Sequence, residues 1–155
     1  IFSLGQKFSE PLGLKFTDES GDQKYVFMGS YGIGISRLLG VIAELKNDER
    51  GIIWPEAVAP FRVHIVTIGD DKDVLLESEN LYRSLTEAGH EVLWDDRLLS
   101  PGHKLADADL IGIPHRVVVS AKTIANNAFE YKNRSALDPS FYDKNELLSV
   151  LGNKK

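Results

Sequence analysis

Apolar and polar positions alternate in regular blocks along the second half of the chain. Residues 61 to 68 alternate apolar and polar side chains and then become fully apolar, which predicts a strand that enters a core. The next apolar residues recur at the spacing of a helix, which Gly89 would end. They are Val74, Leu81, Leu85 and Ala88.

The same alternation continues to the end of the chain. Residues 91–94 predict a short strand, 104–111 a helix and 116–120 an apolar strand. Residues 129–132 predict a further strand, and three leucines mark a terminal helix: Leu147, Leu148 and Leu151. Because strands that alternate with helices form parallel pairs covered by helices, this part predicts an α/β sheet.

The first part of the chain has a different pattern. Residues 1–13 carry apolar side chains at a spacing that predicts a short helix. Residues 14–17 and 24–31 predict two strands joined by a polar turn with a glycine. An amphipathic helix should follow Arg37, but 59 residues provide few core partners for it.

We place a domain boundary in the segment from Asn47 to Pro60, which holds two prolines and little periodicity. The predicted domains are residues 1–59 and 60–155. A chain of 155 residues is long enough for one ordinary domain, or for a small domain with part of another. Because it begins at Ile1 without methionine, we expect a fragment of a longer protein.

Composition excludes several classes of protein. The chain has no cysteine, so disulfides and thiolate zinc sites are excluded, and the four histidines do not fall at ligand-like spacings. No apolar run approaches the roughly 20 residues of a membrane span. The net charge of -5 argues against a broad basic surface, so a nucleic-acid ligand would need a local basic patch.

Candidate chemistry begins with three glycines, Gly29, Gly32 and Gly34, that precede Arg37. Glycine lets a flat or charged ligand lie close to the backbone, and arginine offers a fork of donors that suits phosphate. The stretch therefore favours a nucleotide site, with Ser36 as the expected N-cap of the next helix. The alternative is that the glycines only allow tight packing of a strand on a helix.

Common glycine motifs do not fit this stretch. The dinucleotide fingerprint Gly-x-Gly-x-x-Gly would need glycine at Arg37, and a nucleophile elbow would need glycine at Leu38. The Gly-Lys-Ser/Thr ending of a phosphate-binding P-loop is absent.

Longer runs carry a more specific signal. Residues 29–37 (GSYGIGISR) and 48–55 (DERGIIWP) resemble motif 3 and the exit of the catalytic core in bacterial-type prolyl-tRNA synthetases. Residues 95–97 (DDR), 101–104 (PGHK) and 110–116 (LIGIPHR) resemble the anticodon-binding domain of the same enzymes. The parts occur in the family's order over nearly the whole chain.

The resemblance implies roles for the glycine stretch. Arg37 would be the catalytic residue that contacts the ATP phosphates, while Gly32 and Gly34 let the nucleotide lie against the strand. Gly29 and Ser30 would lie near the proline pocket, where many relatives have cysteine in place of Ser30. The alternatives are an arginine paired with a carboxylate of the core and a serine that only fills space.

A second set of roles concerns the loop that resembles the anticodon-binding region. Asp96 and Arg97 would meet the edges of splayed anticodon bases, and Lys104 would meet a base or a phosphate. The alternative is a solvated strand end with an internal ion pair.

For the whole chain, the resemblance implies a mixed, partly parallel sheet of about five strands flanked by helices, preceded by the edge of an antiparallel class II catalytic core. The full enzyme would use ATP and Mg²⁺ to attach proline to tRNA(Pro). It would be a cytoplasmic homodimer formed through a core outside this chain. This chain alone would be inactive, without cofactor, metal or membrane contact.

Two other readings remain open. One is an accessory RNA-binding module of the same fold without catalysis. The other is a related class II synthetase for glycine, threonine or histidine, against which Trp54-Pro55 favours proline.

Overall fold

The structure is a computed structural model that describes residues 1–152 and separates into two compact units. The first unit comprises Ile1–Leu39 and the second begins at Gly40. None of the helices in the described residues is long and apolar enough to cross a membrane.

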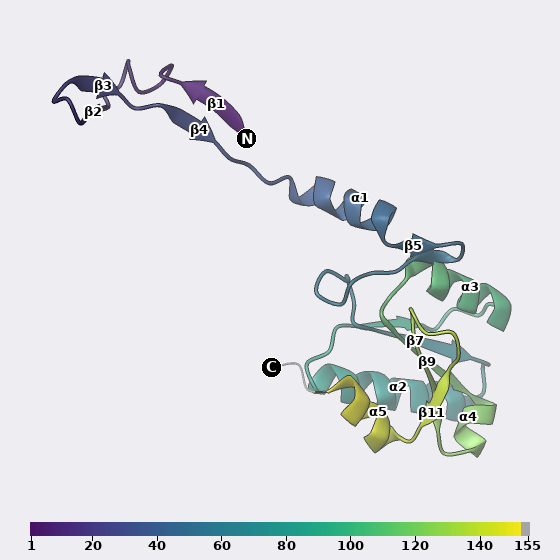
Figure 1. Cartoon of the computed structure of the whole chain (residues 1–155). Coiled ribbons are helices and arrows are strands. Elements are labelled where there is room, and N and C mark those ends of the chain that lie inside the picture. Colours follow the sequence, from purple (N-terminus) through teal and green to yellow (C-terminus); the bar gives the residue numbers. More distant parts are fainter. Residues whose placement is uncertain (153–155) are drawn as a thin grey trace. The chain divides into compact units, whose positions relative to one another are not determined.

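The first unit consists of two small antiparallel pairs of strands and the start of a helix (Figure 1). Strand β1 (Phe2–Gly5) pairs with β4 (Met28–Ser30), and β2 (Lys15–Thr17) forms a hairpin with β3 (Gln23–Tyr25). Helix α1 (Ile35–Leu45) follows, and none of its residues is buried. The expected shortage of core partners for this helix is therefore confirmed.

Three local predictions for this unit are wrong. Residues 2–5 form a strand rather than part of a helix, because the backbone of β4 offers them hydrogen-bonding partners and no core exists for a one-sided helix. The strand predicted over 24–31 is interrupted at Val26 and Phe27. Ser36 is the second residue of α1, so it does not occupy the N-cap position.

The second unit is built on a mixed sheet of five strands in the order β11-β10-β9-β7-β8. Strand β7 (Val63–Ile68) runs parallel to β8 (Val92–Asp95) and to β9 (His115–Ser120). Strand β10 (Phe129–Asn133) is antiparallel to β9 and to β11 (Ser140–Tyr142). The predicted fold, a partly parallel sheet of about five strands, is confirmed.

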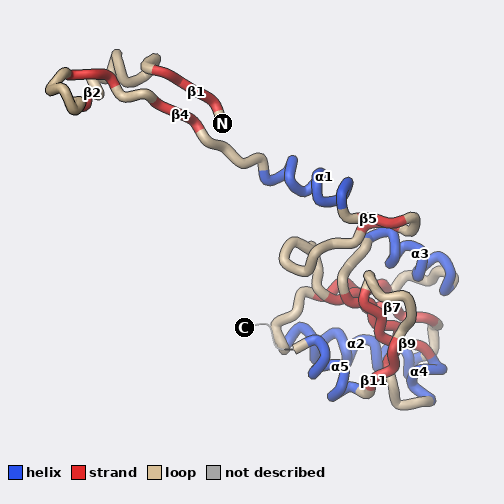
Figure 2. Tube along the Cα trace, in the orientation of Figure 1, coloured by secondary structure: helices blue, strands red, loops and turns tan. Residues whose placement is uncertain are grey.

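Helices cover both faces of this sheet, and Figure 2 shows the strands between them. One face packs against α2 (Lys72–Glu87), α4 (Ala121–Ala125) and α5 (Lys144–Leu151). Alternate residues of β7 explain the two layers: Val63 and Ile65 join that core, whereas Val66 packs on the other face. Helix α3 (Pro101–Ile111) contributes Ala108 and Leu105 to this second face.

The structure adds elements that the apolar pattern did not predict. Strands β5 (Asn47–Asp48) and β6 (Gly51–Ile52) form a tight hairpin within the segment that we had placed at a domain boundary. Helix α4 has only five residues, and a capping box between Ser120 and Thr123 defines its start. Such short elements are stabilised by local polar contacts, which leave no apolar periodicity.

The β5–β6 hairpin packs against the end of α3 through backbone. A Cβ atom on Gly112 would lie 1.9 Å from the carbonyl oxygen of Ile52, and one on Gly51 would lie 2.3 Å from Cα of Leu110. Gly112 also has a φ of 78°, a left-handed conformation that ends the helix. The indole nitrogen of Trp54 donates to the carbonyl oxygen of Ile111 at 2.9 Å.

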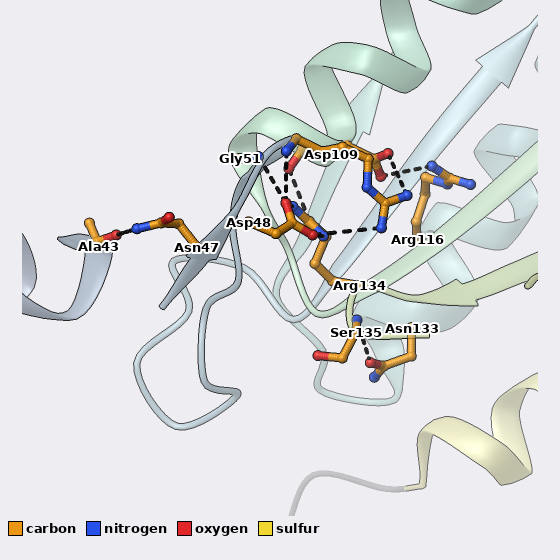
Figure 3. A network of polar contacts seen from close by, with 10 residues as sticks. Ala43, Asn47, Asp48, Gly51, Asp109, Arg116, Asn133, Arg134 and Ser135 are labelled. Atoms are coloured by element: carbon orange, nitrogen blue, oxygen red, sulfur yellow. Dashed lines mark hydrogen bonds and ion pairs between the residues drawn. The ribbon is translucent and has the colours of Figure 1, made fainter. Parts of the chain in front are cut away.

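A buried arginine fixes the same hairpin to the sheet (Figure 3). The Arg134 side chain is 3% exposed and donates to both carboxylate oxygens of Asp48, at 2.9 and 2.6 Å. Its Nε donates to the carbonyl oxygen of Asp109 at 3.0 Å. These hydrogen bonds hold the pKa of Asp48 well below its usual range, so the pair stays charged. Residues 47–54 therefore pack with the second unit.

We expect Gly112→Ala to destabilise the second unit by roughly 2 kcal/mol or more, because the new methyl group meets backbone and the left-handed φ becomes strained. Gly102→Ala is the matched control: this glycine also lies in α3, and its Cβ would meet nothing within 4 Å. Urea unfolding of the two variants measures the difference. Equal stability of the two variants would show that the hairpin is not packed as described.

The boundary predicted between residues 59 and 60 can be tested by truncation. A chain of residues 60–155 keeps the sheet and both helix layers, so we expect a cooperative thermal transition. It loses Asp48, however, and leaves the Arg134 guanidinium without its carboxylate partner. Its melting temperature should lie roughly 5 °C or more below that of residues 40–155. Coincident melting curves would instead favour the boundary at 59.

Candidate functional site

The glycine stretch of the first unit is exposed and extended. Gly29 and Ser30 belong to β4, and the chain then continues without regular structure to the start of α1. A Cβ on Gly32 would meet nothing within 4 Å, so packing within the described residues does not require glycine there. Open backbone beside Gly32 leaves room for a ligand to lie against it.

Arg37 lies in the first turn of α1, and Gly34 precedes that helix directly. Its side chain is exposed and makes no hydrogen bond or ion pair with any described residue. The alternative that Arg37 pairs with a carboxylate is therefore not supported by residues 1–152. A cationic fork with free donors next to open backbone is chemically suited to phosphate.

The second candidate site lies where β7 and β8 end. These parallel strands end at the same edge of the sheet, and the connections that follow them lead to opposite faces, β7 to α2 and β8 to α3. Such a divergence is a common place for ligands in α/β folds. An open hollow of about 370 Å³ lies there, lined by Ile68, Gly69, Asp70, Arg97, Leu98, Leu99, Pro101 and Lys104.

Arg97 is held from two sides in this loop. Its Nε and Nη2 donate to the two carboxylate oxygens of Asp95, at 2.9 and 2.8 Å. Nη2 also donates to Oδ2 of Asp107, on α3, at 2.8 Å. These hydrogen bonds raise the pKa of Arg97 further above its usual value and hold that of Asp95 below its own. The half-exposed guanidinium is therefore a fixed positive charge.

Lys104 does not lie at the surface. It is 2% exposed, and its Nζ donates to the backbone carbonyl oxygens of Thr67 at 2.5 Å and Asp95 at 3.1 Å. The reason is helical spacing: residue 104 lies on the same face of α3 as Ala108, which packs on the sheet. Burial lowers the pKa of Lys104. This position does not support the expected contact of Lys104 with RNA and gives it a structural role instead.

The structure thus brings Arg97 and Lys104 close to one hollow but exposes only Arg97 and its neighbour Asp96. The ion pair between Asp95 and Arg97 is of the kind that the sequence analysis left open as the alternative, whereas Asp107 was missed as a second partner. An aspartate ten residues after an arginine shows no contact in a linear pattern. The available signal for this contact was the helix predicted over residues 104–111. It carries Asp107, and a helix that covers the sheet runs back past the end of the strand before it.

The histidines lie outside both sites or serve packing. His64 is buried on the α3 side of β7, and burial lowers its pKa to about 4. Nδ1 of His115 lies 2.8 Å from the hydroxyl of Tyr131. Among the described residues, no group of three or more histidine, aspartate or glutamate side chains could hold a metal ion.

A family model and several known proteins match this chain. Residues 62–154 match the family described as the anticodon binding domain. A protein of Fervidobacterium nodosum named "Proline--tRNA ligase" is 50% identical over 135 residues, which are 87% of this chain and 23% of that protein. The protein of the same name from Persephonella marina is 45% identical over 97% of this chain. The one from Bacillus cytotoxicus is 51% identical over 79% of this chain. The matches cover 27% and 22% of those proteins.

A solved structure is similar as well. The prolyl-tRNA synthetase of Cryptosporidium parvum, complexed with L-proline and AMP, matches 96% of this chain with a TM-score of 0.79 and 28% identity. The match spans 33% of that chain, and this chain spans about a quarter of the length of the curated relatives. The chain therefore belongs to the anticodon-binding domain family, and it is similar to a portion of proteins named "Proline--tRNA ligase".

Proposed function

We propose that this chain is part of an enzyme that attaches proline to tRNA(Pro) at the expense of ATP, and that its second unit binds the anticodon. The observation that carries the proposal is the 45–51% identity to three proteins named for that activity, together with an exposed arginine held in a loop of the matched domain. The parent enzyme would act in the cytoplasm as a homodimer formed through a core outside this chain.

For the nucleotide, the chain supplies Arg37, Gly32 and Gly34. ATP would supply the α-phosphate that the carboxylate of proline attacks, and pyrophosphate would leave as that bond forms. Arg37 fits this role because its donors are free of other described residues, and it would offset the negative charge that develops on the phosphates. Gly32 leaves the backbone open for a flat ligand. Gly29 and Ser30 would border the proline pocket. We assign no described residue to Mg²⁺, because none of them forms a suitable group of ligands.

For the tRNA, the chain supplies Arg97 and Asp96 beside the hollow at the ends of β7 and β8. Anticodon bases are splayed in single-stranded loops, where side chains can meet their hydrogen-bonding edges. Arg97 offers donors and Asp96 an acceptor. Lys104 contributes indirectly, because its ammonium joins the ends of β7 and β8 under the loop.

We expect Arg97→Ala to weaken binding of a tRNA(Pro) transcript to this chain by about 1 to 2 kcal/mol and to reduce the preference over a transcript with altered anticodon guanines. Fluorescence anisotropy at several salt concentrations measures both effects. Arg83→Ala is the matched control, since Arg83 is an exposed arginine paired with Glu79 on the distant surface of α2.

The control variant Arg83→Ala should lower the affinities for the cognate and the altered transcript slightly and equally. If Arg97→Ala keeps the parent's affinity and its preference between the two transcripts, this loop does not recognise the anticodon.

A further inference from the structure

The guanidinium of Arg97 is only partly available to a ligand. An arginine side chain has five N–H donors, one on Nε and two on each Nη. Asp95 accepts from Nε and Nη2, and Asp107 accepts from Nη2 as well. Three donors are thus engaged, and the two that remain are both on Nη1.

The two carboxylates hold Arg97 differently. Asp95 is the last residue of β8, its side chain is 4% exposed, and it also accepts from the backbone N–H of Arg97 at 3.1 Å. It is therefore part of the sheet edge. Asp107 lies on α3, its side chain is 41% exposed, and among the described residues its side-chain hydrogen bond and ion pair are both with Arg97. Asp107 is the partner that can be removed without opening the core.

We propose that Asp107 is a positioning residue for anticodon recognition: it orients the Arg97 guanidinium so that only Nη1 faces the RNA. The inference rests on the proposed function and deepens it. An N–H of Nη1 held in a fixed direction suits one acceptor atom of a base edge, such as O6 or N7 of guanine. Asp107 itself contacts no base in this arrangement.

Loss of Asp107 changes the donors that Arg97 presents. The side-on pair with Asp95 would persist, but one hydrogen of Nη2 would become free and the guanidinium would lose one of its two anchors. Arg97 would then present three donors over a wider range of orientations. A less oriented cation attracts any RNA equally well and distinguishes acceptor edges less well.

The test is Asp107→Ala in this chain, which removes the acceptor altogether, measured as the ratio of dissociation constants for altered and cognate tRNA(Pro) transcripts. The ratio cancels the added attraction that the loss of one negative charge exerts on both RNAs. We expect it to fall roughly threefold or more. Asp107→Glu, which keeps the charge and can reach Arg97, should restore most of it.

Glu79→Gln is the matched control. Glu79 is a helical carboxylate, 44% exposed, that also pairs with one arginine, and its loss changes the net charge equally. This variant should leave the ratio unchanged. In an Arg97→Ala background, Asp107→Ala should have no further effect on the ratio, because its action passes through Arg97.

Each outcome is decisive. A ratio that stays at the parent value in Asp107→Ala but collapses in Arg97→Ala overturns the role of Asp107 and leaves the proposed function intact. A ratio that survives both variants refutes the loop as the reader. If Asp107→Ala lowers the ratio equally with and without Arg97, Asp107 acts by another route and the inference is wrong. A thermal melt of each variant verifies that the loss is not one of folding, and Asp107→Ser replaces any variant that fails it.

Discussion

Among the described residues, helix α3 packs on the face of the sheet opposite α2, α4 and α5, and polar contacts at both of its ends hold it there. At its start, the ammonium of Lys104 is buried against backbone carbonyl groups of β7 and β8. At its end, Asp109 accepts from Arg116 and Arg50 through its side chain and from Arg134 through its carbonyl group. Three of these cations, Lys104, Arg116 and Arg134, are largely buried. Their burial is costly unless they are paired, so the loop, the helix and the hairpin must keep one arrangement.

This arrangement explains why the two ends of α3 serve different purposes. The first turns lie under the loop that carries Arg97, and the last turn receives the β5–β6 hairpin. Because an α-helix is stiff over eleven residues, the two regions are held at a fixed separation. The candidate RNA-binding loop is therefore supported by regular structure rather than by other loops.

The sequence predicted the second unit far better than the first. The strands and helices of the sheet carry long apolar repeats, and each has a core within the chain, so pattern and structure agree for β7, α2, β9 and α5. The prediction for residues 2–5 was wrong because their partner strand, β4, lies more than twenty residues away and pairs with them through the backbone. The candidate site was found in part: Arg97 could be identified from a motif, but its partner Asp107 and the burial of Lys104 depend on how α3 folds back.

The contact between Gly51, Gly112 and their facing backbones has a consequence for how such a chain can vary. Where a side chain crowds its neighbour, a second substitution nearby can restore the fit. Here each glycine faces main-chain atoms, which are the same in every amino acid. No exchange of a neighbouring side chain can make room for a methyl group, so tolerated variation at these two positions is limited to changes that displace the whole hairpin.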